Sequence, residues 1–186
     1  MSAFLPLFSS CNKNETPKPY AYARLYYPEA DYKSTSLEDC PFRFEYPVFT
    51  APEQPEQSKP GNLWFNLNFL PYKAVLYMSY TETSSIDSLR KYVFSHESLL
   101  RNELPQYAKF RKTSAYQDND RREGYLYEID GNTACPLQFI ITDKRDRFFR
   151  GALIFDQIPE RDSIADILDG MTRDINHIME SFEFIE

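Results

Sequence analysis

The sequence predicts an α+β fold in which an antiparallel β-sheet of about seven strands packs with two amphipathic helices. Of the 186 residues, 14 are Tyr and 15 are Phe, and these rings favour strands because they fit a half-buried pleated surface. Segments of alternating apolar and polar residues follow one another along the chain. Two other segments carry apolar residues at every third or fourth position, which is typical of amphipathic helices.

The first strands are expected between residues 42 and 80. The segment FRFEYPVF (42–49) alternates but contains Pro47, which suits an edge strand. Residues 51–62 have the composition of a loop. WFNLNF (64–69) and AVLYMSY (74–80) are separated by a turn at Pro71 and Tyr72. The two segments therefore predict a strand pair.

A first helix is expected to follow. Ser84 or Ser85 can cap its first N–H groups, and Pro105 is expected to end it. One face of this helix carries residues spaced by three or four positions: Ile86, Leu89, Val93, His96, Leu100 and Leu104.

Four more strands are predicted, at 109–117, 124–130, 136–143 and 147–156. Gly and Asn in the sequence DGN (130–132) tolerate the positive φ of a tight turn, so this segment separates two of the strands. Lys144, Arg145 and Arg147 form a dense basic cluster that predicts a solvated hairpin tip.

The second helix is the clearest element of the sequence. Ser163 and Asp166 have the spacing of a capping box, and Gly170 inside the helix is expected to cost about 1 kcal/mol relative to Ala. The order of strands, helix, strands and helix indicates an antiparallel sheet and resembles the PsbP-like sandwich fold. The apolar face consists of Ile164, Ile167, Leu168, Met171, Ile175, Ile178 and Phe182.

The charge and motif content favour a protein without catalytic, metal or cofactor sites. The net charge of −7 disfavours binding to nucleic acid. His96 and His177 lack ligand spacing, so each is expected to be a hydrogen-bonded structural histidine. Asp118, Asp120 and Glu123 resemble a calcium loop only faintly, because Arg and Glu occupy its fifth and sixth positions. We therefore expect a protein that is not an enzyme.

Cys11 is the candidate lipid attachment site. An apolar residue and two small ones precede such a cysteine in bacterial lipoproteins, and LFSSC (7–11) fits this pattern acceptably. Residues 1–11 are then a signal remnant, residues 12–36 a polar tether or arm, and residues 37–186 one globular domain. Met1–Ser10 has no Lys or Arg, unlike a full signal peptide, so a disordered N-terminus with a stray Cys remains the alternative.

Two further features leave alternatives open. With Cys11 lipidated, Cys40 and Cys135 are either a candidate disulfide pair or two small buried residues. The tyrosine-rich part of the arm is either an interaction surface or an extra strand packed on the body. Its candidate contact residues are Tyr20, Tyr22, Arg24, Tyr26 and Tyr27.

Several segments together resemble one family. They are TPKPYAYARLYYPEADY, DCPFRFEYPVF, WFNLNF, EIDGNTACPLQFIITD, FFRGALIFD and DSIADILDGMTRDINHIMESFEF. This series is similar to the gliding-motility lipoprotein GldD family of Bacteroidetes. The resemblance implies lipidation at Cys11 and a lipid-anchored place in the cell envelope, at the outer membrane facing the periplasm. It also implies support of gliding motility and type IX secretion through other envelope proteins, with no known enzymatic activity.

Two other functions are kept as alternatives. A small-ligand carrier needs an apolar pocket of about 300 Å³ or more, and aromatics such as Trp64 and Tyr127 are expected to line it. A hydrolase needs a cleft that holds two carboxylates at a defined separation, one of them with a raised pKa.

Overall fold

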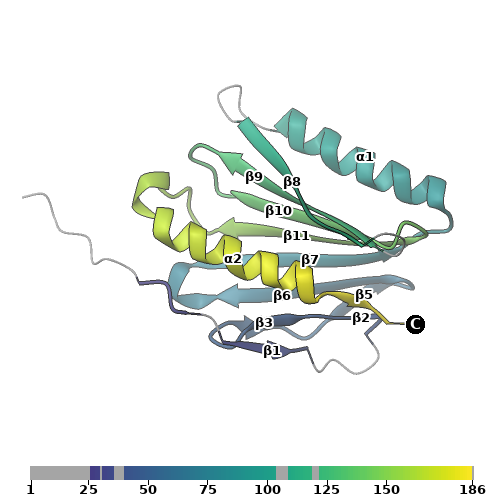
Figure 1. Ribbon diagram of the computed structural model, residues 1–186, viewed down its shortest axis with the longest axis horizontal. Helices are drawn as coiled ribbons and strands as arrows, with labels where there is room; N and C mark the ends of the chain where they lie inside the picture. Colours follow the sequence, from purple (N-terminus) through teal and green to yellow (C-terminus); the bar gives the residue numbers. More distant parts are fainter. Residues whose placement is uncertain (1–25, 30, 36–39, 104–108, 119–121, 186) are drawn as a thin grey trace, which may run out of the picture.

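The structure is a computed structural model that describes residues 26–29, 31–35, 40–103, 109–118 and 122–185. Figure 1 shows a large antiparallel sheet with one helix on each side, which confirms the predicted α+β architecture. Among the described residues this sheet has eight strands, in place of about seven. Across the sheet the order is β4 (Ala51–Pro52), β6 (Asn62–Phe69), β7 (Ala74–Glu82), β11 (Arg147–Phe155), β10 (Leu137–Thr142), β9 (Arg122–Asp130) and β8 (Lys109–Asp118), with β5 (Glu56–Lys59) also paired to β6.

The single strand predicted at 42–49 is wrong, because this segment is divided between two small sheets. β2 (Phe42–Arg43) pairs with β12 (Glu183–Phe184), and β3 (Glu45–Pro47) pairs with β1 (Tyr32–Ser34). β1 and β12, which lie far apart in the sequence, therefore provide the partner strands for this segment. The loop predicted at 51–62 also differs, since β4 and β5 within it bond to the backbone of β6.

The main core lies between one face of the sheet, the helix α2 (Ala165–Ser181) and the strands β2 and β3. Alternate residues of β6, namely Phe65, Leu67 and Phe69, point into this core. Burying each such side chain contributes about 1.5–3 kcal/mol to stability. The rings of Phe149 and Phe182 approach to 4.5 Å between centroids at its centre.

The apolar face predicted for α2 is confirmed, but its predicted capping box is wrong. Ile167, Leu168, Met171, Ile175, Ile178 and Phe182 are buried, and Ile164 is partly buried against the same core. A short 3-10 turn, η2 (Arg161–Ser163), leads into the helix, and Ile164 is the N-cap without a side-chain cap hydrogen bond. The N–H of Ser163 donates to Glu160, which closes the turn that precedes the helix.

The helix α1 (Ile86–Glu103) begins as predicted, with the Oγ of Ser85 accepting a hydrogen bond from the N–H of Ser88. The predicted stop at Pro105 lies outside the described residues. α1 packs on the opposite sheet face from α2 and builds a second, smaller core with β9, β10 and β11 (Figure 1). Neither α1 nor α2, as far as the chain is described, is both long and apolar enough to cross a membrane.

Candidate functional site

The first candidate site is the described part of the predicted arm, which packs against the domain. β1 pairs with β3. The ring of Tyr27 lies 5.1 Å from that of Tyr72 and 5.5 Å from that of Phe49, measured between centroids. Tyr32–Ser34 therefore form an extra strand on the body, and Tyr27 packs against the body without belonging to a strand. Tyr20, Tyr22 and Arg24, the other residues predicted for an interaction arm, lie outside the described residues.

A buried carboxylate on α2 fixes the arm in place. The side chain of Asp174 is fully buried and accepts hydrogen bonds from the hydroxyl of Tyr27 at 2.6 Å and of Tyr32 at 2.9 Å. Arg173 donates to the same carboxylate at 3.2 Å and to the carbonyl of Pro28 at 3.2 Å. Burial and the hydrogen bond to Asp174 raise the pKa of Tyr27 above its ordinary value. Charge-assisted bonds of this kind are the stronger hydrogen bonds in proteins.

Gly170 lets the arm approach α2 closely. A Cβ atom built on Gly170 would overlap the ring of Tyr27. The absence of a side chain at Gly170 therefore leaves space for the ring of Tyr27 against the helix. Helix propensity does not explain this glycine, because glycine is a poor helix former.

Tyr26 is the exposed end of this contact. Its carbonyl accepts a hydrogen bond from the hydroxyl of Tyr72 at 2.8 Å, while its side chain is 78% exposed. The backbone of Tyr26 is bonded to the domain, while its ring faces solvent. Tyr26 therefore presents an exposed aromatic side chain at the start of the described part of the arm.

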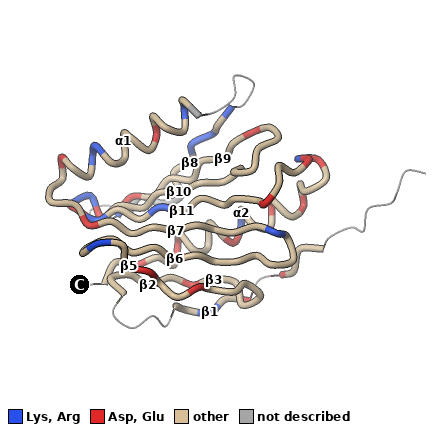
Figure 2. Tube along the Cα trace, turned by 180° about the vertical axis from the view of Figure 1, so that it is seen from behind, with Lys and Arg blue, Asp and Glu red and all other residues tan. Residues whose placement is uncertain are grey.

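The second candidate site is a groove under α1, on the sheet face opposite the arm. The groove has a volume of about 440 Å³ and lies between α1 and the outer faces of β6, β7 and β11. Figure 2 views this side and shows the charges along α1 and near the strand ends, while the middle of β6 and β7 is uncharged. Its partly exposed apolar lining consists of Trp64, Tyr77, Tyr92, Leu99 and Ile154.

Strand alternation builds the floor of the groove. Because Phe65 and Leu67 face the main core, Trp64 and Asn66 face the other side of β6. The pairing of β6, β7 and β11 then places Trp64, Ser79 and Arg150 in one cross-strand row, and Asn66, Tyr77 and Ala152 in the next. The small side chains of Ser79 and Ala152 leave room between larger neighbours.

Polar groups in the groove come from α1 and β11. His96 is only 6% exposed, and its Nε2 atom has no hydrogen-bond partner in the described part of the chain. Burial, assisted by the charge of Arg150, lowers the pKa of His96 to about 4. The hydrogen-bonded histidine predicted here is therefore wrong for this nitrogen. The prediction is confirmed for His177, whose Nε2 lies 2.8 Å from a carboxylate oxygen of Glu45.

Of the two aromatics predicted for a ligand pocket, Trp64 lines the groove and Tyr127 does not. Tyr127 is fully buried in the smaller core, and its hydroxyl donates to Glu97 at 2.8 Å. α1 covers this part of the sheet, so Tyr127 does not reach the groove.

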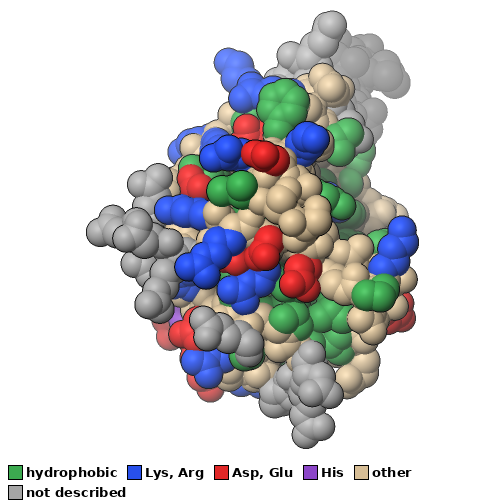
Figure 3. Space-filling view, turned by 90° about the vertical axis from the view of Figure 1, so that its right-hand side faces the viewer, with side chains coloured by type: hydrophobic (Ala, Val, Ile, Leu, Met, Phe, Trp, Pro, Cys, Tyr) green, Lys and Arg blue, Asp and Glu red, His purple; other side chains and the backbone are tan. Residues whose placement is uncertain are grey.

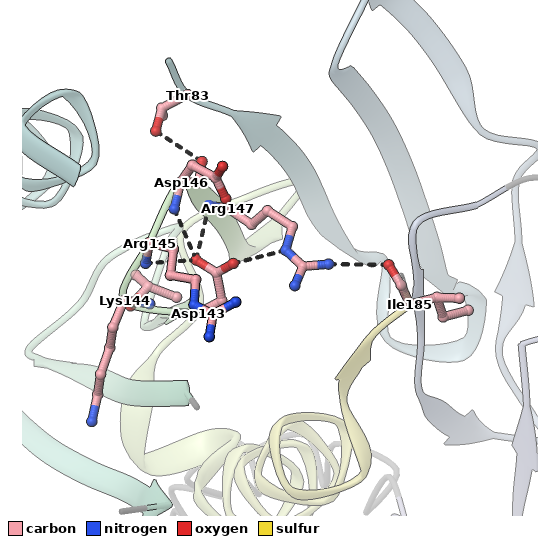
Figure 4. Close-up of polar contacts among 8 residues, drawn as sticks. Thr83, Asp143, Lys144, Arg145, Asp146, Arg147 and Ile185 are labelled. Atoms are coloured by element: carbon pink, nitrogen blue, oxygen red, sulfur yellow. Dashed lines mark hydrogen bonds and ion pairs between the residues drawn. The ribbon is translucent and has the colours of Figure 1, made fainter. Parts of the chain in front are cut away.

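The β10–β11 hairpin is as predicted, with Arg145 exposed at its tip, but Arg147 is not solvated as predicted (Figure 4). The carboxylate of Asp143, on a residue 4% exposed, accepts hydrogen bonds from the N–H groups of Arg145, Asp146 and Arg147 at 2.9–3.1 Å. It also accepts one from Nε of Arg147 at 2.8 Å, and the same guanidinium donates to the carbonyl of Ile185 at 3.0 Å. Figure 3 shows acidic and basic side chains intermixed at this end of the molecule. Arg147 thus ties the turn to the C-terminal segment.

The Asp143 turn predicts a pH dependence of stability. Burial alone would raise the pKa of Asp143, but the hydrogen bonds from Arg147 and the turn backbone outweigh it and hold the pKa below its usual value. A depressed folded-state pKa stabilises the protein above the unfolded pKa, and this stability is lost as the pH falls through the folded pKa. Asp143→Asn should therefore cost about 1 kcal/mol at pH 7 and progressively less below about pH 4. Urea unfolding across this range measures the difference, and a constant difference would contradict the assignment.

The remaining predictions concern the candidate disulfide, metal binding and the acidic turn. Cys40 and Cys135 are both half-buried and are not bonded to each other, so the structure does not contain the candidate disulfide. Cys40 packs at the edge of the main core, and Cys135 lies in the loop before β10. Among the described side chains, no three His, Cys, Asp or Glu residues are grouped to hold a metal ion. Asp120 of the acidic turn lies outside the described residues.

The family model of the gliding motility lipoprotein GldD matches residues 12–184. A search of curated proteins found no match. A match among solved structures is the solution structure of cyanobacterial PsbP (CyanoP) from Synechocystis sp. PCC 6803, with 13% identity, a TM-score of 0.45, and coverage of 84% of this chain and 94% of that one. The chain belongs to the gliding motility lipoprotein GldD family.

Proposed function

We propose that this protein is a non-enzymatic envelope lipoprotein that supports gliding motility and type IX protein secretion by binding other envelope proteins. Membership of its family associates the chain with gliding motility and with a membrane-anchored place in the envelope. That match, over residues 12–184, is the observation that carries the proposal. Type IX secretion, a Bacteroidetes host and an outer-membrane anchor facing the periplasm are parts of the proposal.

The anchor in this proposal is a lipid on Cys11. This cysteine directly precedes the range matched by the family model. From Cys11 to Tyr26, where the described arm begins, the chain can span at most about 50 Å. A domain held within that distance of a bilayer is placed to meet other proteins at the same membrane surface.

The contact surface in this proposal begins at Tyr26. Tyr and Arg are frequent among the residues that dominate binding energy at interfaces, and Tyr20, Tyr22 and Arg24 precede Tyr26 closely in the sequence. The bonds of Tyr27 and Tyr32 to Asp174 hold the following residues on the domain. This fixed attachment presents Tyr26 in a constant position and reduces the entropy lost on binding.

The test uses Tyr26→Ala in a strain that lacks the chromosomal gene. We expect colony spreading to be lost while the melting temperature of the purified variant stays within about 1 °C of wild type, because the Tyr26 side chain is exposed. Phe94→Ala is the matched control, since Phe94 is 71% exposed on α1. Normal spreading with Tyr26→Ala would exclude this residue from the contact surface.

The small-ligand carrier is a second candidate function, favoured by the 440 Å³ groove under α1. The arm and the groove lie on opposite faces of the sheet. One protein can therefore hold a partner with the arm and a ligand in the groove.

A further inference from the structure

We propose that the groove under α1 binds a small organic acid, with its carboxylate at Arg150 and its apolar body between Trp64, Tyr77 and Tyr92. This site goes beyond the role in motility. It does not depend on lipidation or on the arm.

The size and lining of the groove suit the apolar body of such a ligand. Its volume of about 440 Å³ falls within the range of small-molecule sites. Trp64, Tyr77 and Tyr92 are 60%, 47% and 48% exposed, and they come from β6, β7 and α1. Large apolar side chains exposed together around one hollow are typical of a ligand-binding groove, whereas apolar side chains scattered singly need no explanation.

The charge of the groove selects an anion. Arg150 is the one charged residue among the described side chains that line it, and no carboxylate lines it. The protein as a whole has a net charge of −7, so this cationic lining differs from the average surface. The side chain of Arg150 has no ion pair or hydrogen bond within the described part of the chain, which leaves its guanidinium available for a bidentate bond to a carboxylate.

His96 supplies the second polar contact. Its Nε2 atom is buried without a partner, and a buried polar atom in that state costs about 1–3 kcal/mol. His96 lines the same groove as Arg150, and the charge of Arg150 acts on it. Because Nε2 is buried, the imidazole must turn toward a carboxylate bound at Arg150 to donate a hydrogen bond to it, and that bond would satisfy the unpaired atom.

The test uses the fluorescence of Trp64, because it is the only tryptophan in the sequence and lies on the groove wall. The full chain is titrated with two acids, decanoate and 4-phenylbutyrate, and with the matching alcohols, 1-decanol and 4-phenyl-1-butanol. We expect at least one acid to shift the emission of Trp64 in a saturable way and to bind at least tenfold more tightly than its alcohol.

Arg150→Gln should weaken binding of that acid at least tenfold without changing the melting temperature, because the side chain is exposed and makes no described bond. Arg90→Gln is the matched control, an exposed arginine on α1 outside the groove. In NMR spectra the ¹⁵N resonance of His96 Nε2 should move with the acid and not with the alcohol.

Three results would overturn the proposal. The first is that neither acid changes the emission of Trp64. The second is that Arg150→Gln binds the acid as tightly as wild type does. The third is equal binding of acid and alcohol, which would indicate an apolar site that does not select a carboxylate. Colony spreading tests the motility role separately, so failure of one proposal is distinguishable from failure of the other.

Discussion

Asp174→Ala is expected to lower the free energy of unfolding by about 3 kcal/mol. The substitution leaves the hydroxyls of Tyr27 and Tyr32 without their acceptor and removes the partner of Arg173. Each polar group left buried and unpaired costs about 1–3 kcal/mol. Urea unfolding of the purified domain measures the change. Asp174→Asn, which keeps one acceptor oxygen, should show an intermediate loss.

The matched control for this prediction is Asp169→Ala, because Asp169 is an exposed carboxylate on the same helix. Its change in unfolding free energy should stay within about 0.5 kcal/mol. If Asp174→Ala were no more destabilising than Asp169→Ala, the arm would not be held by this carboxylate.

Gly170→Ala is expected to destabilise the protein by about 2 kcal/mol, although helix propensity favours alanine by about 1 kcal/mol. The loss arises because the new methyl group would overlap the ring of Tyr27 and displace the arm from α2. Thermal and urea unfolding determine the sign.

A double-mutant cycle isolates the cause of this effect. In a Tyr27→Ala background the overlap is absent, so Gly170→Ala should become stabilising by up to about 1 kcal/mol. Destabilisation of the same size in both backgrounds would show that the contact between Gly170 and Tyr27 is not responsible.

The sequence pattern predicted the helices better than the small strands. The apolar faces of α1 and α2 follow from local periodicity, and their residues are largely those that pack in the two cores. β4 and β5 could not be predicted in this way, because their composition is that of a loop. They are strands through pairing with β6, helped near β4 by hydrogen bonds from Asn66 and Asn68 to Glu53.

The arm contact could not be found from spacing. Tyr27 and Tyr32 are 147 and 142 positions away from Asp174, and neither residue belongs to a motif. A tyrosine-rich segment is equally consistent with an interaction surface and with an extra strand packed on the body. The signal that separates them is Gly170, an otherwise unfavourable residue on the buried face of an amphipathic helix.

The groove was predicted in part. Alternation in β6 places Trp64 on the face away from the main core, and the sequence alone indicates this. How far α1 extends over that face depends on tertiary packing, so Tyr127 was expected to line the pocket but is covered by α1. Arg150 was missed because an isolated arginine among apolar residues within β11 has no distinctive pattern.

The central claim is that the anchored protein is required for motility and secretion. Its most direct test deletes the gene in the host, restores it as wild type or as Cys11→Ala at equal protein levels, and measures type IX cargo in the culture fluid. The account predicts that cargo and colony spreading are lost on deletion and return only with the form that can be lipidated. Normal secretion in the deletion strain, or full rescue by Cys11→Ala, would contradict it.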